Sequence, residues 1–212
     1  EYMAQSPHVI KCQTVATMRA EHSAPYGLIN DATIVIQDDR ISWVGPSAKC
    51  PPMYADAKMV DFRDRLVTPS FVDCHTHIVS GGNRAQEFEM RLNGASYEEI
   101  ARSGGGIIST VTATRAASLD DLIDDALPRV DAMLSEGTSL IEIKSGYGLD
   151  METELKMLRA AKRIAELRPI RIQKTFLGAH AVPTEFAGES DRYIDELCIP
   201  TLRAAHAEGL VD

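Results

Sequence analysis

Several features that define other classes of protein are missing from this 212-residue sequence. It has no apolar run of about 18 residues that could span a membrane, and no basic segment followed by an apolar one that would indicate an export signal. Positive charge is also scarce, because 22 lysines and arginines face 31 aspartates and glutamates, a formal net charge of −9. That acidic balance argues against binding to nucleic acids or to anionic membrane surfaces.

Cysteine is sparse and scattered, and nucleotide-binding glycine motifs are absent. The four cysteines (Cys12, Cys50, Cys74 and Cys198) form neither a C-x-x-C pair nor a dense framework, which indicates a reducing compartment and predicts a cytoplasmic protein. The glycine triplet at 104–106 lacks the residues of a P-loop or a dinucleotide turn, so we interpret it as a flexible loop. The 44% hydrophobic and 25% charged content is that of an ordinary globular protein.

The stretch from Val67 to His77, VTPSFVDCHTH, carries the strongest chemical signal. If it is a strand, Asp73, His75 and His77 share one face, while Cys74 points to the other face and is expected in the core. The apolar residues before Asp73 predict a buried approach. Two imidazoles one strand period apart can hold a single metal ion, and zinc and iron suit such ligands. The pattern therefore predicts His75 and His77 as metal ligands.

Elsewhere the sequence alternates between strand and helix patterns. Two β-rich runs at 33–36 and 41–44 flank an acidic turn and predict a hairpin, with a possible third strand at 58–62, whereas residues 1–25 hold little pattern. Further on, strands are predicted at 139–144 and 170–177. Helices are predicted from Ser96 to Arg102, from Ser118 to Gly137, from Asp150 towards Pro169 and from Ser190 towards Glu208. Such alternation indicates parallel β-α-β units and an α/β fold.

Further candidate residues lie just past the predicted strands, where barrel enzymes place their sites. They are Arg84 in a Gly-Gly-Asn-Arg turn, Tyr147 between two glycines, and His180 after the third strand. A guanidinium fits a substrate carboxylate, and an imidazole can steady a developing oxyanion. From the residues alone, an exposed loop arginine, a packing tyrosine and a structural histidine remain open. The other histidines, His8, His22 and His206, are expected at the surface or in caps.

Four strings together resemble the imidazolonepropionase family of the amidohydrolase superfamily, from Ile34 to the end of the chain. They are residues 67–77, Gly-Gly-Asn-Arg84, Glu-Ile-Lys-Ser-Gly-Tyr-Gly-Leu149 and Thr-Phe-Leu-Gly-Ala-His180. The resemblance implies a TIM (β/α)8 barrel preceded by a small β-sandwich subdomain. Residues 1–66 would belong to that subdomain and residues 67–212 to about the first three βα units. Because a closed barrel needs roughly 250 residues, the chain resembles the N-terminal half of such an enzyme.

The resemblance also implies an activity. It is the metal-dependent hydrolysis of the cyclic amide of 4-imidazolone-5-propanoate to N-formimidoyl-L-glutamate, a step of histidine degradation. One zinc or iron ion is expected on His75 and His77, with the remaining ligands and the general acid/base beyond Asp212. Arg84, Tyr147 and His180 would bind the substrate, and His180 would be catalytic. The complete enzyme is expected to be a homodimer.

Two alternatives remain open at this point. The chain can belong to another amidohydrolase, such as a cyclic-amide hydrolase or a deaminase, because His-x-His alone does not select a substrate. It can also be an inactive metal-binding fragment. Lys144 invites comparison with the carbamylated lysine that bridges two metals in some superfamily members. That lysine lies on the fourth strand, however, and Lys144 lies on the second, so we expect Lys144 to be structural.

Overall fold

The computed structural model describes residues 6–21, 23–96, 98–99 and 105–212. The chain divides into two compact units, Glu1–Ser70 and Phe71–Asp212. Within the described residues, no helix is long and apolar enough to cross a membrane. His22, most of the predicted helix Ser96–Arg102 and the first glycine of the 104–106 triplet lie outside the described part. The predicted cap of that helix is described, and the Glu99 backbone N–H donates to Ser96 Oγ at 3.2 Å.

The first unit is built on a four-stranded sheet with the strand order β3-β2-β1-β4. Its elements are β1 (His8–Ala16), the 3-10 turn η1 (Pro25–Gly27), β2 (Leu28–Gln37), β3 (Arg40–Pro46), the 3-10 turns η2 (Ser47–Lys49) and η3 (Pro52–Tyr54), and β4 (Lys58–Val67). The hairpin prediction is confirmed, because β2 and β3 pair antiparallel. The central strand β1 was not predicted, and it pairs antiparallel with β2 and parallel with β4.

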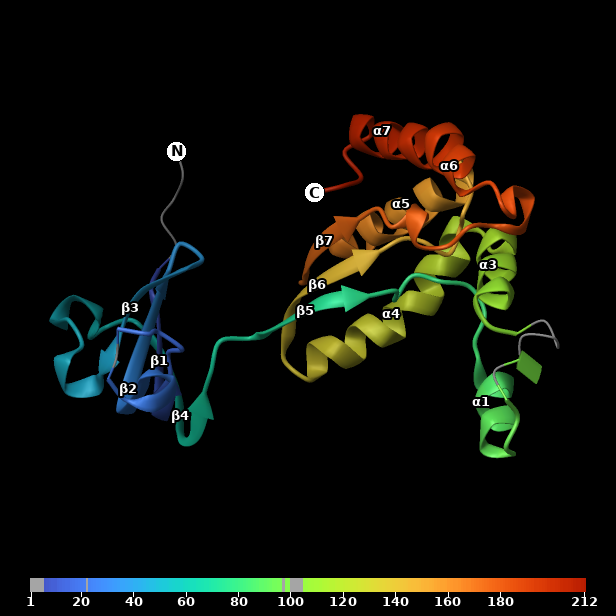
Figure 1. Ribbon diagram of the computed structural model, residues 1–212. Coiled ribbons are helices and arrows are strands. Elements are labelled where there is room, and N and C mark those ends of the chain that lie inside the picture. The colour runs from blue at the N-terminus through green and yellow to red at the C-terminus, as the bar shows by residue number, and fades with distance from the viewer. Residues whose placement is uncertain (1–5, 22, 97, 100–104) are drawn as a thin grey trace. The chain divides into compact units, whose positions relative to one another are not determined.

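The second unit is a parallel three-stranded sheet with helices, as the alternating pattern predicted (Figure 1). Its elements are β5 (Phe71–Thr76), α1 (Ala85–Leu92), α3 (Ile107–Ala116), α4 (Leu119–Ser135), β6 (Thr138–Lys144), α5 (Met151–Leu167), β7 (Arg171–Thr175), the 3-10 turns η4 (Gly178–His180) and η5 (Thr184–Phe186), α6 (Ser190–Tyr193), the π-helical turn η6 (Ile194–Cys198) and α7 (Ile199–Ala207). The strand order is β5-β6-β7. Each strand therefore lies beside the next one along the chain.

The core of the second unit lies between one face of this sheet and the helices α4 and α5. Ile141 and Ile143 of β6 are buried there against Leu122 of α4 and Met157 of α5. Because side chains alternate along a strand, Glu142 and Lys144 project from the opposite face. Burying the apolar face against two amphipathic helices is the main stabilising contribution expected for such a layer. Glu142 and Lys144 therefore lie on the face of the sheet opposite α4 and α5.

Strand β5 differs from the prediction in its exposure. Phe71 is 63% exposed and Val72 is 58% exposed, so the predicted buried approach is wrong for the described structure. Cys74, predicted in the core, is also exposed, and all four cysteines are free. The physical reason is position, because β5 is the edge strand of its sheet and pairs with β6 alone. Side chains on both faces of such a strand are covered only where a neighbouring element packs on them.

The helices begin and end largely where the sequence indicated. Ser118 caps α4 in a capping box with Asp121, and Asp150 caps α5 by accepting from the Thr153 backbone N–H at 2.7 Å. The last predicted helix is interrupted, because the π-helical turn η6 joins α6 to α7. Helices α1 and α3 were not predicted, since both follow turns in which glycine obscures the helical pattern.

Candidate metal and substrate site

His75 and His77 lie at the end of β5, with their rings close together. His75 belongs to the strand and His77 follows its last residue, and the two ring centroids are 5.4 Å apart. The strand end is held by two hydrogen bonds. Thr76 Oγ1 donates to the Glu142 carbonyl at 2.8 Å, and the His75 backbone N–H donates to Asp73 Oδ1 at 3.1 Å. The period-2 geometry of a strand therefore brings both imidazoles to one place.

His77 has the properties of a metal ligand. Its Nδ1 atom is buried and has no hydrogen-bond partner among the described residues. Burial lowers the pKa of its imidazole, and neighbouring positive charge, that of His180 foremost, lowers the pKa further. The neutral ring is the form that binds a metal ion. A half-buried imidazole with a lowered pKa and an unused, buried nitrogen thus fits a metal, although the described residues hold no group of three or more His, Cys, Asp and Glu side chains that could bind one.

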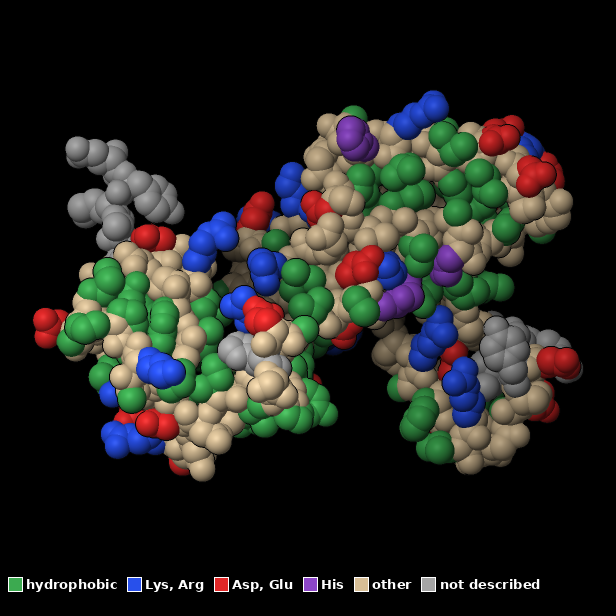
Figure 2. All heavy atoms as spheres, turned by 60° about the vertical axis from the view of Figure 1, so that its left-hand side comes forward, with side chains coloured by type: hydrophobic (Ala, Val, Ile, Leu, Met, Phe, Trp, Pro, Cys, Tyr) green, Lys and Arg blue, Asp and Glu red, His purple; other side chains and the backbone are tan. Residues whose placement is uncertain are grey.

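Two loops bring further rings against His77. Tyr147, after β6, lies with its ring centroid 4.9 Å from that of His77, and His180, after β7, lies 5.8 Å from it. The Tyr147 and His180 centroids are 6.0 Å apart. The carboxyl ends of neighbouring parallel strands meet at one sheet edge, which explains why segments distant in sequence converge here. Figure 2 shows histidine side chains reaching the surface beside acidic and basic ones.

The ring of His180 has a defined hydrogen-bonding state. Its Nδ1 atom lies 2.9 Å from the Leu177 carbonyl oxygen. A carbonyl oxygen can only accept, so Nδ1 must carry the proton of this bond. In the neutral ring, Nε2 then has no proton and can only accept, whereas in the imidazolium form Nε2 can donate. His180 is exposed, and Nε2 is the ring nitrogen that the bond to Leu177 does not occupy, so it is the one that can meet a substrate.

Arg84 lies directly before α1, as the N-cap residue of that helix. Its Nε donates to Thr110 Oγ1 on α3 at 3.0 Å, and the side chain is otherwise exposed. The preceding Gly81 packs closely on α3, because an added Cβ would lie 2.6 Å from the Ala113 carbonyl oxygen. The loop and α3 thus fix Arg84 at one nitrogen and leave the rest of its guanidinium group accessible. The described contacts do not join Arg84 to the rings of His77, Tyr147 and His180.

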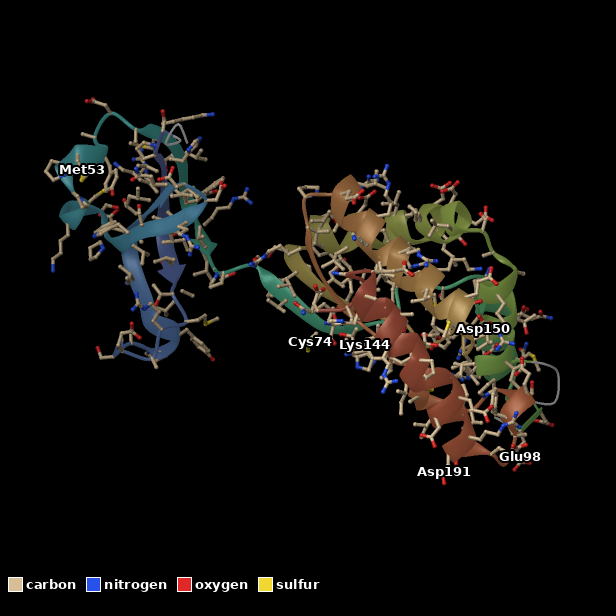
Figure 3. All side chains as sticks on the ribbon, turned by 90° about the horizontal axis from the view of Figure 1, so that it is seen from above. Met53, Cys74, Glu98, Lys144, Asp150 and Asp191 are labelled. Atoms are coloured by element: carbon tan, nitrogen blue, oxygen red, sulfur yellow. The ribbon has the colours of Figure 1, made fainter. Side chains whose placement is uncertain are left out.

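Lys144 forms an ion pair with Glu142 on the same strand. The carboxylate of Glu142 also accepts from Thr175 Oγ1 at 2.6 Å, which links β6 to β7. Two hydrogen bonds lower the pKa of Glu142. The bond from Lys144 has the larger effect, and the bond from Thr175 has the smaller one. Figure 3 shows Lys144 at the end of β6 and Asp150 at the start of α5. Lys144 is thus engaged in a strand-to-strand network.

Two residues that the sequence analysis passed over support the loops of the site. Glu154 of α5 is fully buried and accepts from the backbone of the Tyr147 loop. Arg115 of α3 donates from Nε to the Gly148 carbonyl at 2.7 Å and pairs with Asp150 at 2.9 Å. A signal for Glu154 exists in the sequence, since it lies on the apolar stripe of its helix, where a carboxylate is out of place. Arg115 offers no comparable signal.

Comparison with solved structures defines the class of the fold. No family model matches the chain. The structure resembles 5-methylcytosine deaminase from Klebsiella pneumoniae, with a TM-score of 0.50, 21% identity and coverage of 78% of this chain and 35% of that one. It also resembles a triazine hydrolase variant, with a TM-score of 0.51, 15% identity and coverage of 81% and 36%. The α/β fold of this chain is therefore similar to part of the fold of these two enzymes.

Curated relatives define the family within that class. The chain is 62% identical to an imidazolonepropionase of Ruegeria sp. over 205 residues, which is 97% of this chain and 50% of the relative. It is 62% identical to one of Roseobacter denitrificans over 93% of the chain, and 56% identical to one of Rhizobium meliloti over 93%. This chain belongs to the imidazolonepropionase family, and it spans about half the length of the curated relatives it matches.

Proposed function

We propose that this chain supplies the metal-binding histidines and part of the substrate pocket of an imidazolonepropionase. The reaction is the hydrolytic opening of the ring of 4-imidazolone-5-propanoate to N-formimidoyl-L-glutamate. The observation that carries the proposal is the convergence of His77, Tyr147 and His180, whose ring centroids lie within 6.0 Å of one another. These residues come from three of the four strings that resemble the family, and each follows a different strand.

His75 and His77 would hold one zinc or iron ion, through nitrogens such as the unpartnered Nδ1 of His77. A metal ion bound there supplies a water of lowered pKa and polarises a carbonyl group. The complete enzyme is proposed to be a cytoplasmic homodimer that takes the remaining ligands from its other half. The lowered pKa of His77 favours its neutral form, and both side chains present their nitrogens at the end of β5.

The other residues have distinct roles in the proposal. Tyr147 contacts the substrate ring from its place beside His77 and His180. The Nε2 atom of His180, in the imidazolium form, donates to the ring carbonyl oxygen as negative charge develops there, because the bond to Leu177 already occupies the Nδ1 proton. Arg84 receives the propionate carboxylate on its accessible nitrogens. Binding the propionate tail of a small substrate in this way fixes the position of its ring.

Replacing Arg84 by methionine in the full-length protein tests the substrate. A charge-assisted hydrogen bond contributes about 1.5–3 kcal/mol, so kcat/KM should fall roughly 10- to 100-fold, at about 1.4 kcal/mol per decade. The matched control is Arg91→Met, an exposed arginine on the same helix, which should leave kcat/KM within about twofold. A ring substrate without the carboxylate should be almost indifferent to either change. An unaltered kcat/KM in Arg84→Met would reject the carboxylate-binding role.

A second candidate function has one observation in its favour. The described residues hold no group of three or more His, Cys, Asp and Glu side chains that is placed to bind a metal ion. A catalytic zinc usually has three protein ligands and one open position. On that ground, the 212 residues by themselves would be an inactive metal-binding fragment. Assaying the isolated chain beside the full-length protein distinguishes the two candidate functions. Turnover by the isolated chain would reject the hypothesis that it is an inactive fragment.

A further inference from the structure

Glu154 is a fully buried carboxylate in the first turns of α5, with 0% of its surface exposed. Its Oε1 atom accepts from two consecutive backbone N–H groups, that of Gly148 at 2.8 Å and that of Leu149 at 2.9 Å. These residues directly follow Tyr147. Hydrogen bonds to a charged acceptor are stronger than neutral ones. The carboxylate therefore ties down the loop that presents the tyrosine ring.

The loop adopts a conformation that needs such support. Leu149 has a φ of +54°, a left-handed conformation that a non-glycine residue keeps only where its surroundings hold it. Gly148 lies directly against the start of α5, because an added Cβ would be 2.7 Å from the Glu154 backbone nitrogen. On the other side of the loop, Arg115 donates to the Gly148 carbonyl. The backbone N–H of Gly148 is thus bonded to the buried side chain of Glu154, and its carbonyl to the half-buried side chain of Arg115.

A second buried polar residue supports the neighbouring loop. Tyr193 donates from its hydroxyl to the carbonyl of Gly178 at 2.7 Å, and Gly178 is the first residue of the turn η4 that carries His180. Tyr193 is 1% exposed, and burial, followed by a hydrogen bond with Cys198, raises the pKa of its hydroxyl. Keeping a carboxylate fully buried is unfavourable unless its hydrogen bonds compensate.

We propose that Glu154 is a positioning residue, which fixes the Tyr147 ring beside His77 and His180 through the amides of Gly148 and Leu149. It does not contact the substrate. The inference rests on the proposed function where its test measures ring opening. The restraint of the loop from Ser145 to Asp150 can be measured without any substrate.

The test compares three variants of the full-length protein. Glu154→Leu removes both acceptor oxygens, Glu154→Gln keeps a carbonyl oxygen that can accept from both amides, and Glu152→Leu changes an exposed glutamate in the same turn of α5. Because a small displacement of a positioning group can cost about 100-fold in rate, Glu154→Leu should lower kcat/KM roughly 10- to 100-fold. Glu154→Gln should recover most of the loss, and bound metal should stay unchanged in all three. Glu154→Asp, with a shorter reach, serves if Glu154→Leu does not fold.

Two readouts separate positioning from general damage to the fold. In a Tyr147→Ala background, Glu154→Leu should cause almost no further loss, because coupled residues are not additive. Hydrogen–deuterium exchange of residues 145–150 should accelerate in Glu154→Leu and not in Glu152→Leu. A fully additive loss, or an unchanged exchange rate in this segment, overturns the proposal. If the parent protein fails to open the imidazolone ring, the proposed function is rejected, while the exchange comparison still decides the role of Glu154.

Discussion

Gly146 lies so close to His180 that a Cβ atom added to it would be 2.7 Å from Cε1 of the histidine ring and 2.9 Å from Nδ1. The two residues belong to different loops, one after β6 and one after β7. The missing side chain of Gly146 is therefore what allows the ring of His180 to stand beside that of Tyr147. Gly146 also has a φ of +114°, which L side chains rarely adopt.

The first prediction follows from this contact. Gly146→Ala should displace His180 or the Tyr147 loop and lower kcat/KM about 10- to 100-fold in the full-length protein, while bound metal is retained. The control is Gly188→Ala, because Gly188 also has a positive φ, +80°, but an added Cβ there has nothing within 4 Å. If both variants lose the same activity, backbone strain is responsible and the contact with His180 is not.

The second prediction concerns the metal ligands. His75→Ala and His77→Ala should each abolish bound zinc or iron in the full-length protein, because each removes a proposed ligand at the end of β5. Elemental analysis of the purified proteins measures this directly. His206→Ala, which changes an exposed histidine in the last turn of α7, should keep the metal content of the parent. Full metal occupancy in both β5 variants would remove His75 and His77 from the site.

The third prediction concerns pH and the link between β6 and β7. Bonds from Lys144 and Thr175 lower the pKa of Glu142 below its usual value of 4.5. A carboxyl group with a depressed folded-state pKa adds stability that is present above 4.5 and is lost as pH falls through the folded-state pKa. Glu142→Gln should therefore lower the free energy of unfolding by about 1 kcal/mol near neutral pH, and this difference should shrink in acid.

Denaturant unfolding of the full-length protein over a series of pH values measures this effect. Glu136→Gln changes an exposed glutamate at the end of α4, and its small effect should not vary with pH. A difference between Glu142→Gln and the parent that stays constant from neutral pH to below pH 4 would show that the carboxylate charge contributes nothing there.

The fourth prediction concerns the edge strand β5 in the isolated 212 residues. An edge strand with exposed apolar side chains offers unpaired backbone groups to a second molecule, so the isolated chain should self-associate. Val72→Lys should reduce association, measured by light scattering or sedimentation. Leu92→Lys is the control, because Leu92 is 73% exposed but lies on helix α1, where backbone groups are paired within the helix. A monodisperse monomer of the unmodified chain would contradict the prediction.

The sequence predicted those parts of the structure that depend on local periodicity. Strands β6 and β7 and helices α4 and α5 follow alternating or helical apolar patterns, and the caps Ser118 and Asp150 mark where the helices begin. The rule that barrel enzymes carry their sites at strand ends predicted that Tyr147 and His180 would lie near the histidines. Their proposed roles still rest on the family resemblance, which geometry alone does not supply.

Other features depend on contacts between distant segments, and a single sequence does not contain them. Strand β1 has no clean alternation, and it is defined by pairing with β2 and β4 on its two sides. The exposure of Phe71 and Cys74 depends on which strand lies at the sheet edge, which residue types do not reveal. Glu154 stands out in the sequence only as a carboxylate on an apolar helix stripe, and its bonding partners are known only once the Tyr147 loop lies against α5.

The π-helical turn η6 changes the direction in which the side chains of the last helical segment point, so that residues before and after the turn face different neighbours. One extra residue in a turn rotates everything that follows by about 100°. Before the turn, Tyr193 faces the Gly178 carbonyl, and after it Ala205 is buried against Leu158 of α5. Deleting one residue within Ile194–Cys198 would restore a continuous α-helix, in which only one of these two contacts can form. The extra residue thus works as a rotational spacer that allows one helical segment to serve the site and the core together.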